Sequence, residues 1–294
     1  MTVPVADRPA SRPFAARRFF ARHTIGLIGL TILLCAVSAA LFAPWIAPHP
    51  PSAVNLMARL APPAWVEGGS MTHILGTDNL GRDILSRVIY GAQVSLSVGA
   101  GAVVLGAIIG SSVGLLAGYF GGWVDAVLSF LINVQLSFPF TLLAIFLLAS
   151  FGGGFVSVVV VVALATWVNY ARVVRGQVMS VTNQDYVEAA RTVGVPTLRI
   201  LRHYILPNIL SPIIVVASFS MAQAILTEAA LSFLGVGVGG TQPSWGMMLN
   251  DGRNYLQNAW WMTAMPGIAT ALTVLAGNLC GDWLQDRTDP RLRK

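Results

Sequence analysis

Residues 181–208 read VTNQDYVEAARTVGVPTLRILRHYILPN and interrupt a chain whose neighbouring segments are apolar enough to lie in lipid. This stretch carries the charged or titratable side chains Asp185, Glu188, Arg191, Arg199, Arg202 and His203. A charge at the centre of a bilayer costs about 2.5–3.5 kcal/mol on the translocon-insertion scale. We therefore expect residues 181–208 to lie outside the hydrocarbon, and their arginines favour the cytoplasmic side of the membrane.

The first part of this stretch predicts a short helix over residues 184–193. Its expected apolar face comprises Tyr186, Ala189, Ala190 and Val193. Glu188 and Arg191 lie three residues apart in the sequence, so we expect them to pair across one helical turn.

A break then separates this helix from a second one. Gly194 suits the C-terminal stop of the first helix, and Pro196 suits the first turn of the second, which we expect to run to Pro207. Two short helices in a loop between membrane spans form an elbow that is suited to press on a soluble partner. The alternative is a solvated amphipathic loop without a partner.

The spacing of these residues resembles the EAA loop in permease subunits of bacterial binding-protein-dependent ABC importers. The shared pattern is EAA at residues 188–190, then Gly194, then Leu-Pro at 206–207, although Tyr204 stands where the family pattern has isoleucine. In that family the loop is a coupling helix that docks into a groove of the ATPase subunit. The resemblance implies an ATPase-coupling role for Tyr186, Glu188, Ala189, Ala190, Arg191, Gly194, Leu206 and Pro207.

The composition is that of a membrane protein with several spans. Of the 294 residues, 55% are hydrophobic and only 10% are charged, whereas a soluble domain carries about 25% charged residues. The formal net charge is +6, which would also suit a nucleic-acid partner. The basic residues are spread over loops that flank the spans, however, and the positive-inside rule explains them better. We expect no nucleic-acid partner.

The lysine content excludes one function. The only lysine is Lys294, the last residue, and a P-loop needs a lysine directly after its glycines. ATP and Mg²⁺ would therefore bind to partner ATPase subunits, and we expect no cofactor in this chain. The sequence lacks the HExxH motif, and its GxSxG string, residues 110–114, lies within an apolar span rather than at a strand-to-helix turn. We therefore expect neither catalytic residues nor a bound metal.

The apolar pattern predicts an all-α polytopic protein with six transmembrane helices. The expected spans are residues 25–46, 94–116, 124–148, 156–174, 209–234 and 262–283. Together with the resemblance, this pattern predicts the architecture of a type I ABC importer permease with a cytoplasmic coupling helix.

The same pattern divides the chain into five regions. These are a cytoplasmic arm at 1–22, a first transmembrane helix at 23–47, a periplasmic segment at 48–92, a permease core at 93–283 with the coupling loop 176–208, and a cytoplasmic tail at 284–294. Of the 18 basic residues, the predicted external segments hold only Arg59, Arg82, Arg87 and Arg253. This bias places both termini in the cytoplasm.

Residues 73–96, HILGTDNLGRDILSRVIYGAQVSL, predict an amphipathic interfacial helix that leads into the second span. Asp78 or Asn79 suits its N-cap, and Asp83 and Arg87 are spaced to pair. The string also resembles the C-type permease subunit in the peptide/nickel branch of the ABC importers. Either a structural role or an ionic substrate gate is open for Asp78, Arg82, Asp83 and Arg87.

Two features within the spans predict how the helices pack. Glycines recur at four-residue spacing in the second span, at Gly106, Gly110, Gly114 and Gly118. Small residues let helix backbones approach closely in lipid, so this face should pack against another span or a partner permease. In the third span, the Ser-Phe-Pro step at 137–139 should kink the helix, because proline removes a backbone hydrogen bond.

The fifth span carries Glu228 near its external end. An ionisable side chain within a span is by default a functional-site hypothesis, here proton or substrate chemistry. The alternative is that it snorkels, or accepts backbone hydrogen bonds, at the external end. Residues 231–249 and the C-terminal GDWLQDRTDPRLRK also resemble strings of the same importer branch.

The resemblance implies that the chain is one half of a permease heterodimer for di- or oligopeptide uptake. Nickel, another metal chelate or glutathione is the alternative cargo. The implied partners are a second homologous permease subunit, two cytoplasmic ABC ATPase subunits, an extracytoplasmic substrate-binding protein and the lipid of the bacterial inner membrane. A stand-alone secondary transporter that uses Glu228 or Asp125 is the competing hypothesis, but the internal repeats of such proteins are not evident.

Overall fold

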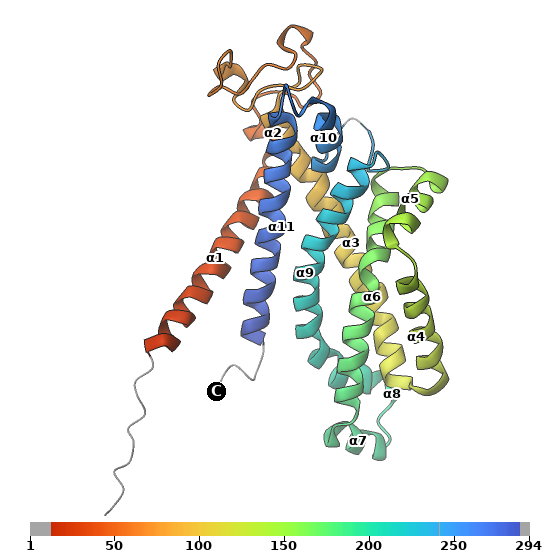
Figure 1. Ribbon diagram of the computed structural model, residues 1–294. Coiled ribbons are helices and arrows are strands. Elements are labelled where there is room, and N and C mark those ends of the chain that lie inside the picture. The colour runs from red at the N-terminus through yellow and green to blue at the C-terminus, as the bar shows by residue number, and fades with distance from the viewer. Residues whose placement is uncertain (1–12, 241, 289–294) are drawn as a thin grey trace, which may run out of the picture.

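The computed structural model describes residues 13–240 and 242–288, and within these ranges the secondary structure is helical and contains no strand. An isolated antiparallel bridge joins Thr77 and Asp83. The helices, labelled in Figure 1, are α1 (Pro13–Leu41), α2 (Ala43–Ile46), α3 (Ile84–Phe120), α4 (Gly122–Ser137), α5 (Phe140–Phe151), α6 (Phe155–Thr182), α7 (Asp185–Thr192), α8 (Thr197–Ile200), α9 (Leu206–Phe233), α10 (Trp245–Gly252) and α11 (Trp261–Thr288).

Five helical segments of the described chain are long and apolar enough to cross a membrane. They lie in α1, α3, α6, the continuous segment from α8 to α9, and α11. The predicted third span is present as α4 and α5, which meet at an angle of 89°. The bend falls at Phe138 and Pro139, as the sequence indicated. Counting the bent pair as one span brings the number to six.

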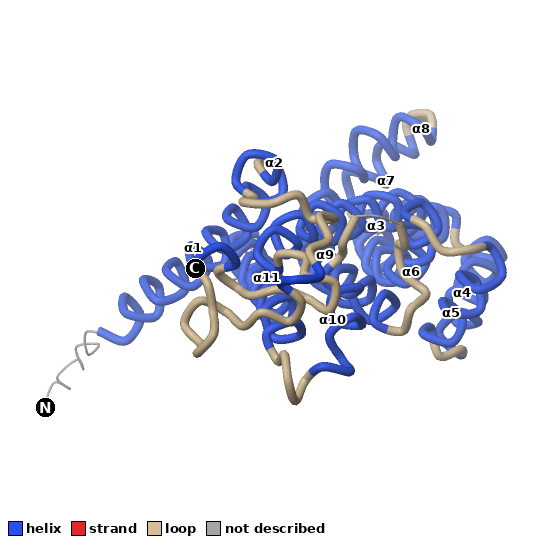
Figure 2. Tube along the Cα trace, turned by 90° about the horizontal axis from the view of Figure 1, so that it is seen from above, coloured by secondary structure: helices blue, strands red, loops and turns tan. Residues whose placement is uncertain are grey.

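The helices pack into one bundle in which α3 lies along α6 (Figure 2). α9 contacts both of these helices, and α11 contacts α9 on one side and α1 on the other. A buried apolar cluster joins α3, α6 and α9 through residues such as Val98, Val162 and Ala224. These contacts leave the outward faces of the helices covered with exposed apolar side chains, as a lipid environment requires.

The four glycines spaced through α3 lie against α6. A Cβ on Gly110 would collide with the carbonyl oxygen of Trp167, and a Cβ on Gly114 would lie 2.5 Å from the carbonyl oxygen of Ala171. Gly106 and Gly118 are similarly close to α6. The glycine face therefore packs against α6 of the same chain rather than against a partner permease.

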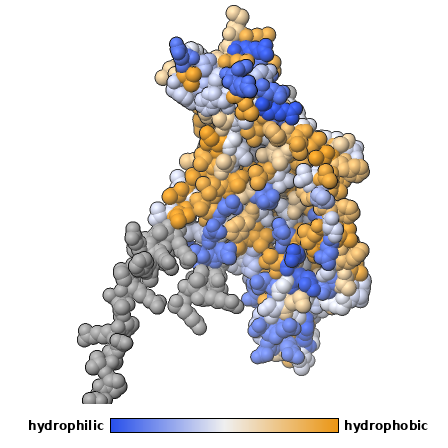
Figure 3. Space-filling model, viewed as in Figure 1, coloured by the Kyte–Doolittle hydropathy of each residue, from blue (hydrophilic) through white to orange (hydrophobic). Residues whose placement is uncertain are grey.

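The two ends of the bundle differ. α7 lies at one end, together with the start of α1 and the end of α11 (Figure 1). At the other end lie α10 and residues 47–83, which we call the 47–83 segment. Hydrophilic residues gather at both ends, and hydrophobic residues cover much of the sides (Figure 3).

Three helix boundaries differ from the predicted ones. α1 begins at Pro13, inside the predicted arm, because neither glycine nor a second proline follows until Gly26; residues 1–12 lie outside the described part. The second span begins at Ile84, since the predicted interfacial helix forms the first turns of α3. α11 continues to Thr288, and the rest of the predicted tail lies outside the described residues.

Candidate functional site

Residues 184–207, which we call the elbow, connect α6 to α9. α7 ends at Thr192, and Gly194 adopts a φ of +76°, a left-handed conformation that favours glycine. Its N–H donates to the carbonyl oxygen of Arg191 at 3.0 Å, which closes the helix end. The first predicted helix and its stop are thus present within a residue of the expected bounds.

The second predicted helix does not end at Pro207. α8 passes through a π-helical turn, Leu201–Ile205, directly into α9, so that Thr197–Phe233 is one continuous helical segment. Pro207 lies inside this segment, directly after the π-helical turn. The wider π-helical turn accommodates the proline without a break. Movement of the elbow is therefore linked directly to α9.

α7 is held by a small apolar contact on one side. Val187 and Ala190 are buried there, and Val187 belongs to an apolar cluster with Ile200 and Ile205. The predicted apolar face is therefore only partly correct, because of its four residues only Ala190 is buried. The others form an exposed strip, Tyr186, Ala189 and Val193, of which Val193 is 78% exposed. The Tyr186 ring is partly exposed and stacks on Tyr204, with the ring centres 6.3 Å apart.

The predicted pair between Glu188 and Arg191 is absent. Arg191 instead places its guanidinium 4.9 Å from the centre of the Tyr119 ring, which ties α7 to the end of α3. Glu188 is exposed. Leu206 and Pro207 are also exposed, at the base of the elbow. The elbow thus presents an acidic side chain beside an apolar strip, with its other face anchored to the bundle.

At the opposite end, a buried ionic cluster fixes the start of α3. Asp78 is fully buried and accepts hydrogen bonds from Arg82 Nε at 2.6 Å and from Arg87 Nη1. Both arginines also donate to Asp251 of α10, at 3.3 and 3.2 Å. This arrangement favours the structural interpretation of the cluster over a substrate gate.

The N-cap of α3 and the partner of Arg87 both differ from those predicted from the sequence. The N-cap of α3 is Asp83 rather than Asp78 or Asn79, because its carboxylate accepts from Ser86 N at 2.8 Å. Arg87 does not pair with Asp83 either, since its guanidinium pairs with Asp78 and Asp251 instead.

Glu228 is fully buried rather than snorkelling at a membrane surface. Its Oε2 accepts from Ser95 Oγ at 3.0 Å, and its Oε1 accepts from Ser232 Oγ at 2.7 Å. Ser95 Oγ in turn accepts from Trp245 N at 3.3 Å. This network joins α3, α9 and α10, and its hydroxyl partners were not identified from the sequence.

Asp125, the other acidic residue considered for proton chemistry, is also engaged. Arg175 Nη2 of α6 donates to Asp125 Oδ2 of α4 at 2.7 Å. The pair bridges the two helices near the elbow end of the bundle, next to Gly121 and Gly122. Its geometry is that of a helix–helix tie.

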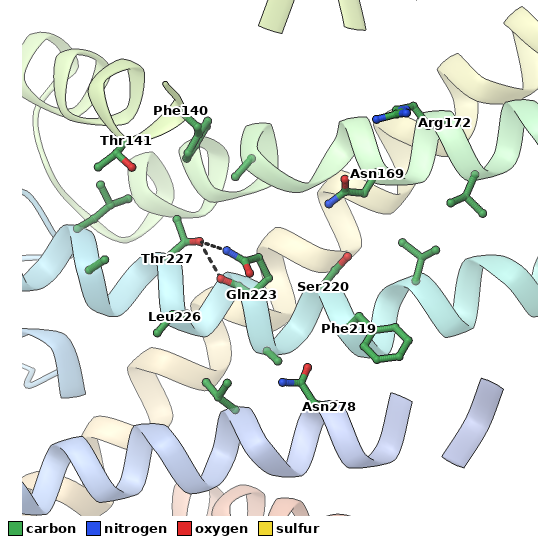
Figure 4. A pocket seen from close by; sticks show the side chains of 17 residues that line it. Phe140, Thr141, Asn169, Arg172, Phe219, Ser220, Gln223, Leu226, Thr227 and Asn278 are labelled. Carbon is green, nitrogen blue, oxygen red and sulfur yellow. Dashed lines mark hydrogen bonds between the residues drawn. The ribbon is translucent and has the colours of Figure 1, made fainter. Parts of the chain in front are cut away.

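A cavity of about 1130 Å³, lined by both apolar and polar side chains, lies between α5, α6, α9 and α11. Figure 4 shows its labelled polar lining, which comprises Thr141, Asn169, Arg172, Ser220, Gln223, Thr227 and Asn278. Gln223 and Thr227 are linked, since Thr227 Oγ1 donates to the carbonyl oxygen of Gln223 at 2.7 Å. This cavity was not predicted from the sequence, although Ser220, Gln223 and Thr227 form a polar stripe at helical spacing in an otherwise apolar span.

Two protein-family models match this chain. The family model for the binding-protein-dependent transport system inner membrane component matches residues 110–294. The chain belongs to this family. A second model, the N-terminal TM domain of oligopeptide transport permease C, matches residues 15–63. The chain is therefore a permease subunit of a binding-protein-dependent ABC importer, as the elbow motif predicted.

Relatives of this permease span nearly its whole length. The di/tripeptide transport system permease protein DppC of Pseudomonas aeruginosa (strain UCBPP-PA14) is 42% identical over 293 residues, which cover 99% of this chain and 97% of the relative. The dipeptide transport system permease protein DppC of Escherichia coli (strain K12) is 45% identical over 276 residues, or 94% and 92% of the two chains.

A solved structure supports the fold of this permease. A chain of the MetNI methionine ABC transporter, in an inward-facing conformation, superposes with a TM-score of 0.56. It is 18% identical and covers 69% of this chain and 96% of its own. Together these findings confirm an all-α, multi-pass permease, a translocation subunit that works with ATPase partners.

Proposed function

We propose that this permease forms half of the transmembrane pathway for uptake of di- or other short peptides. The relatives named for dipeptide and di/tripeptide transport, at 42% and 45% identity, support the cargo. The second half of the pathway comes from a homologous permease subunit, and an extracytoplasmic binding protein delivers the peptide. Glutathione, nickel or another metal chelate is the alternative cargo.

The observation that carries this proposal is the group of polar side chains that line the cavity. Its lining offers amide and hydroxyl groups, among them Asn169, Gln223 and Asn278, that can exchange hydrogen bonds with a peptide backbone. Arg172 adds an exposed guanidinium that suits a terminal carboxylate. Such groups are costly within a span unless they face a partner or water, so a pathway wall explains why they occur together.

The elbow supports a coupling role. Its exposed strip comprises Tyr186, Ala189 and Val193, and the small side chain of Ala189 lets a partner surface approach the helix closely. Glu188 lies beside the strip. A strip of this kind suits a groove on an ATPase subunit, where ATP and Mg²⁺ would bind. Because the elbow continues into α9, which lines the cavity, movement of the ATPase would reach the pathway directly.

The positions of the ends support an orientation in the bacterial inner membrane. The start of α1 and the end of α11 lie at the same end of the bundle as α7 (Figure 1). If the elbow meets a cytoplasmic ATPase, both termini are cytoplasmic and the 47–83 segment faces the binding protein.

Reconstitution into liposomes tests the pathway. The chain assembled with a homologous permease subunit, ATPase subunits and the binding protein should take up dipeptide only when ATP is present. Gln223→Leu should lower uptake at limiting peptide while assembly is unchanged. Ser112→Ala, an exposed position of α3 away from the cavity, is the matched control.

The same system tests the cargo. Arg172→Gln should reduce the preference for a dipeptide over its C-terminal amide, since the amide lacks the carboxylate that the guanidinium would bind. Equal uptake by Gln223→Leu and wild type, or peptide flux through the isolated chain without ATP, would reject the proposed pathway.

A further inference from the structure

Three metal-ligating side chains meet in the 47–83 segment and at the start of α3. They are His49, His73 and Asp83, and one ligand atom from each lies within 4.8 Å of those of the other two. His49 follows α2, His73 ends the short 3₁₀-helix Met71–His73, and Asp83 caps α3. The three residues are thus far apart in the sequence and are brought together by the fold.

The spacing of the ligand atoms is close to that of a transition-metal site. His73 Nδ1 is hydrogen-bonded to Asp83 Oδ1 at 3.0 Å, a contact that a bound ion would replace, and His49 Nδ1 lies 3.9 Å from Asp83 Oδ2. Ligands bound at 2.0–2.1 Å in a tetrahedral arrangement lie about 3.3–3.4 Å apart. The two N–O distances bracket this spacing, and one nitrogen of each ring lies within 4.8 Å of the other. Movement of the His49 side chain toward His73 and Asp83 would therefore place all three around one ion.

An unsatisfied atom points to the same site. His49 Nδ1 is buried and has no hydrogen-bond partner among the described residues, although buried polar atoms usually have one. The His49 and His73 rings lie 4.9 Å apart, centre to centre. A cation between these rings and Asp83 would give the unsatisfied nitrogen a ligand bond.

The carboxylate at this site is already oriented. Asp83 is 2% exposed, and its Oδ2 accepts from Ser86 N at 2.8 Å and from Ser86 Oγ at 2.7 Å. The same hydroxyl accepts from the main-chain N–H of His49 at 3.0 Å. Groups that orient metal ligands in this way are typical of metal sites. The side chain of His49 remains 33% exposed, which leaves a route for an ion.

We propose that His49, His73 and Asp83 bind a divalent transition-metal ion of the Zn²⁺ class, with water in the fourth position. Imidazole ligands favour Zn²⁺ or Ni²⁺ over Mg²⁺ and Ca²⁺, which prefer oxygen. The ion joins the chain just after α2 to the start of α3 and so fastens the 47–83 segment across the bundle end. Its role is structural, and it is separate from the proposed cargo.

Metal binding to the full-length chain in detergent tests this proposal. Equilibrium dialysis against Zn²⁺ alone should give one ion per chain, and His49→Ala should weaken binding by at least about tenfold, as loss of a ligand requires. His203→Ala, a histidine of the elbow, is the matched control and should bind as wild type does. Mg²⁺ should not compete.

A second readout reports on the structural role. Trypsin cleavage after Arg59, an exposed residue between the two histidines, should slow when Zn²⁺ is added to wild type but not to His49→Ala. This variant removes no hydrogen bond of the His49 side-chain Nδ1, so it should fold. The proposal is overturned if wild type binds no Zn²⁺, if His49→Ala binds it equally well, or if His203→Ala loses it.

Discussion

The elbow and the 47–83 segment lie at opposite ends of one bundle and are built in opposite ways. The elbow keeps its charged side chains in solvent and is anchored by a few apolar contacts and the Arg191–Tyr119 stack. The other end buries Asp78 and Arg87, and ion pairs join both arginines of this cluster, Arg82 and Arg87, to Asp78 and Asp251. One end of the permease is thus fastened internally, and the other presents a surface to a partner.

The difference has a physical reason. A buried charge must be paired, and losing one partner is costly, so a buried cluster fixes the chain around it. Exposed charges and apolar side chains contribute little to folding and remain available for binding. We therefore expect substitutions at the fastened end to lower stability, and those on the elbow strip to leave stability unchanged and lower coupling.

The largest expected loss of stability comes from Asp78→Ala. It leaves the buried guanidinium of Arg87 without its main carboxylate, which should cost about 3–5 kcal/mol. Thermal unfolding in detergent would measure the loss. Glu67→Ala, at an exposed acidic residue of the same segment, should unfold at the wild-type temperature. If the two variants were equally stable, the fastened end would not depend on its ionic cluster.

Gly110→Ala should come next, at about 1–3 kcal/mol, because overpacking forces α3 and α6 apart. The added Cβ would collide with the carbonyl oxygen of Trp167. Gly176→Ala, in α6 with no atom within 4 Å of its added Cβ, is the matched control and should be neutral or stabilising, since alanine is the better helix former. Chemical denaturation of both variants would compare them.

Glu228→Leu should cost about 1–3 kcal/mol, because it leaves the hydroxyls of Ser95 and Ser232 without their acceptor. Glu228→Gln keeps one acceptor oxygen and should be closer to wild type in thermal unfolding. If Glu228→Gln abolished ATP-driven uptake at wild-type stability, Glu228 would have a transport role beyond joining α3, α9 and α10.

Val193→Asp should have the smallest effect on stability, within about 0.5 kcal/mol, because an exposed side chain contributes little to folding. Val193 is 78% exposed. The same change should weaken ATPase binding, since it places a charge in the proposed apolar contact. Co-purification of ATPase subunits with the variant would measure this, and undiminished co-purification would place the contact elsewhere on the elbow.

The sequence predicted most of the fold because membrane spans leave strong local signals. Long apolar runs marked the spans, Pro139 marked the bend between α4 and α5, and Gly194 marked the stop of α7. The continuous α8–α9 segment was missed, because a proline at 207 reads as a helix end unless a π-helical turn accommodates it.

Much of the candidate site depends on contacts that no local pattern shows. The sequence marked Asp78 and Arg87 as a possible ionic group, but Asp251, which completes it, lies far along the chain. The hydrogen bond between Ser95 and Glu228 likewise joins residues that are distant in the sequence, and so does the contact of His49 with His73 and Asp83. The cavity did leave a signal in the sequence, the polar stripe of α9. This stripe is hidden when hydropathy is averaged over the whole span.

We expect the elbow to transmit the work of ATP hydrolysis to the bundle, and Gly194→Pro would interrupt this transmission at a single residue. Proline holds φ near −65° and cannot adopt the +76° of Gly194, so the orientation of α7 must change while the spans remain intact. ATP hydrolysis and peptide uptake should be measured in the same liposomes. We expect the variant complex to insert and to hydrolyse ATP while peptide uptake falls to background. Wild-type uptake per ATP hydrolysed would show that the elbow does not couple the two.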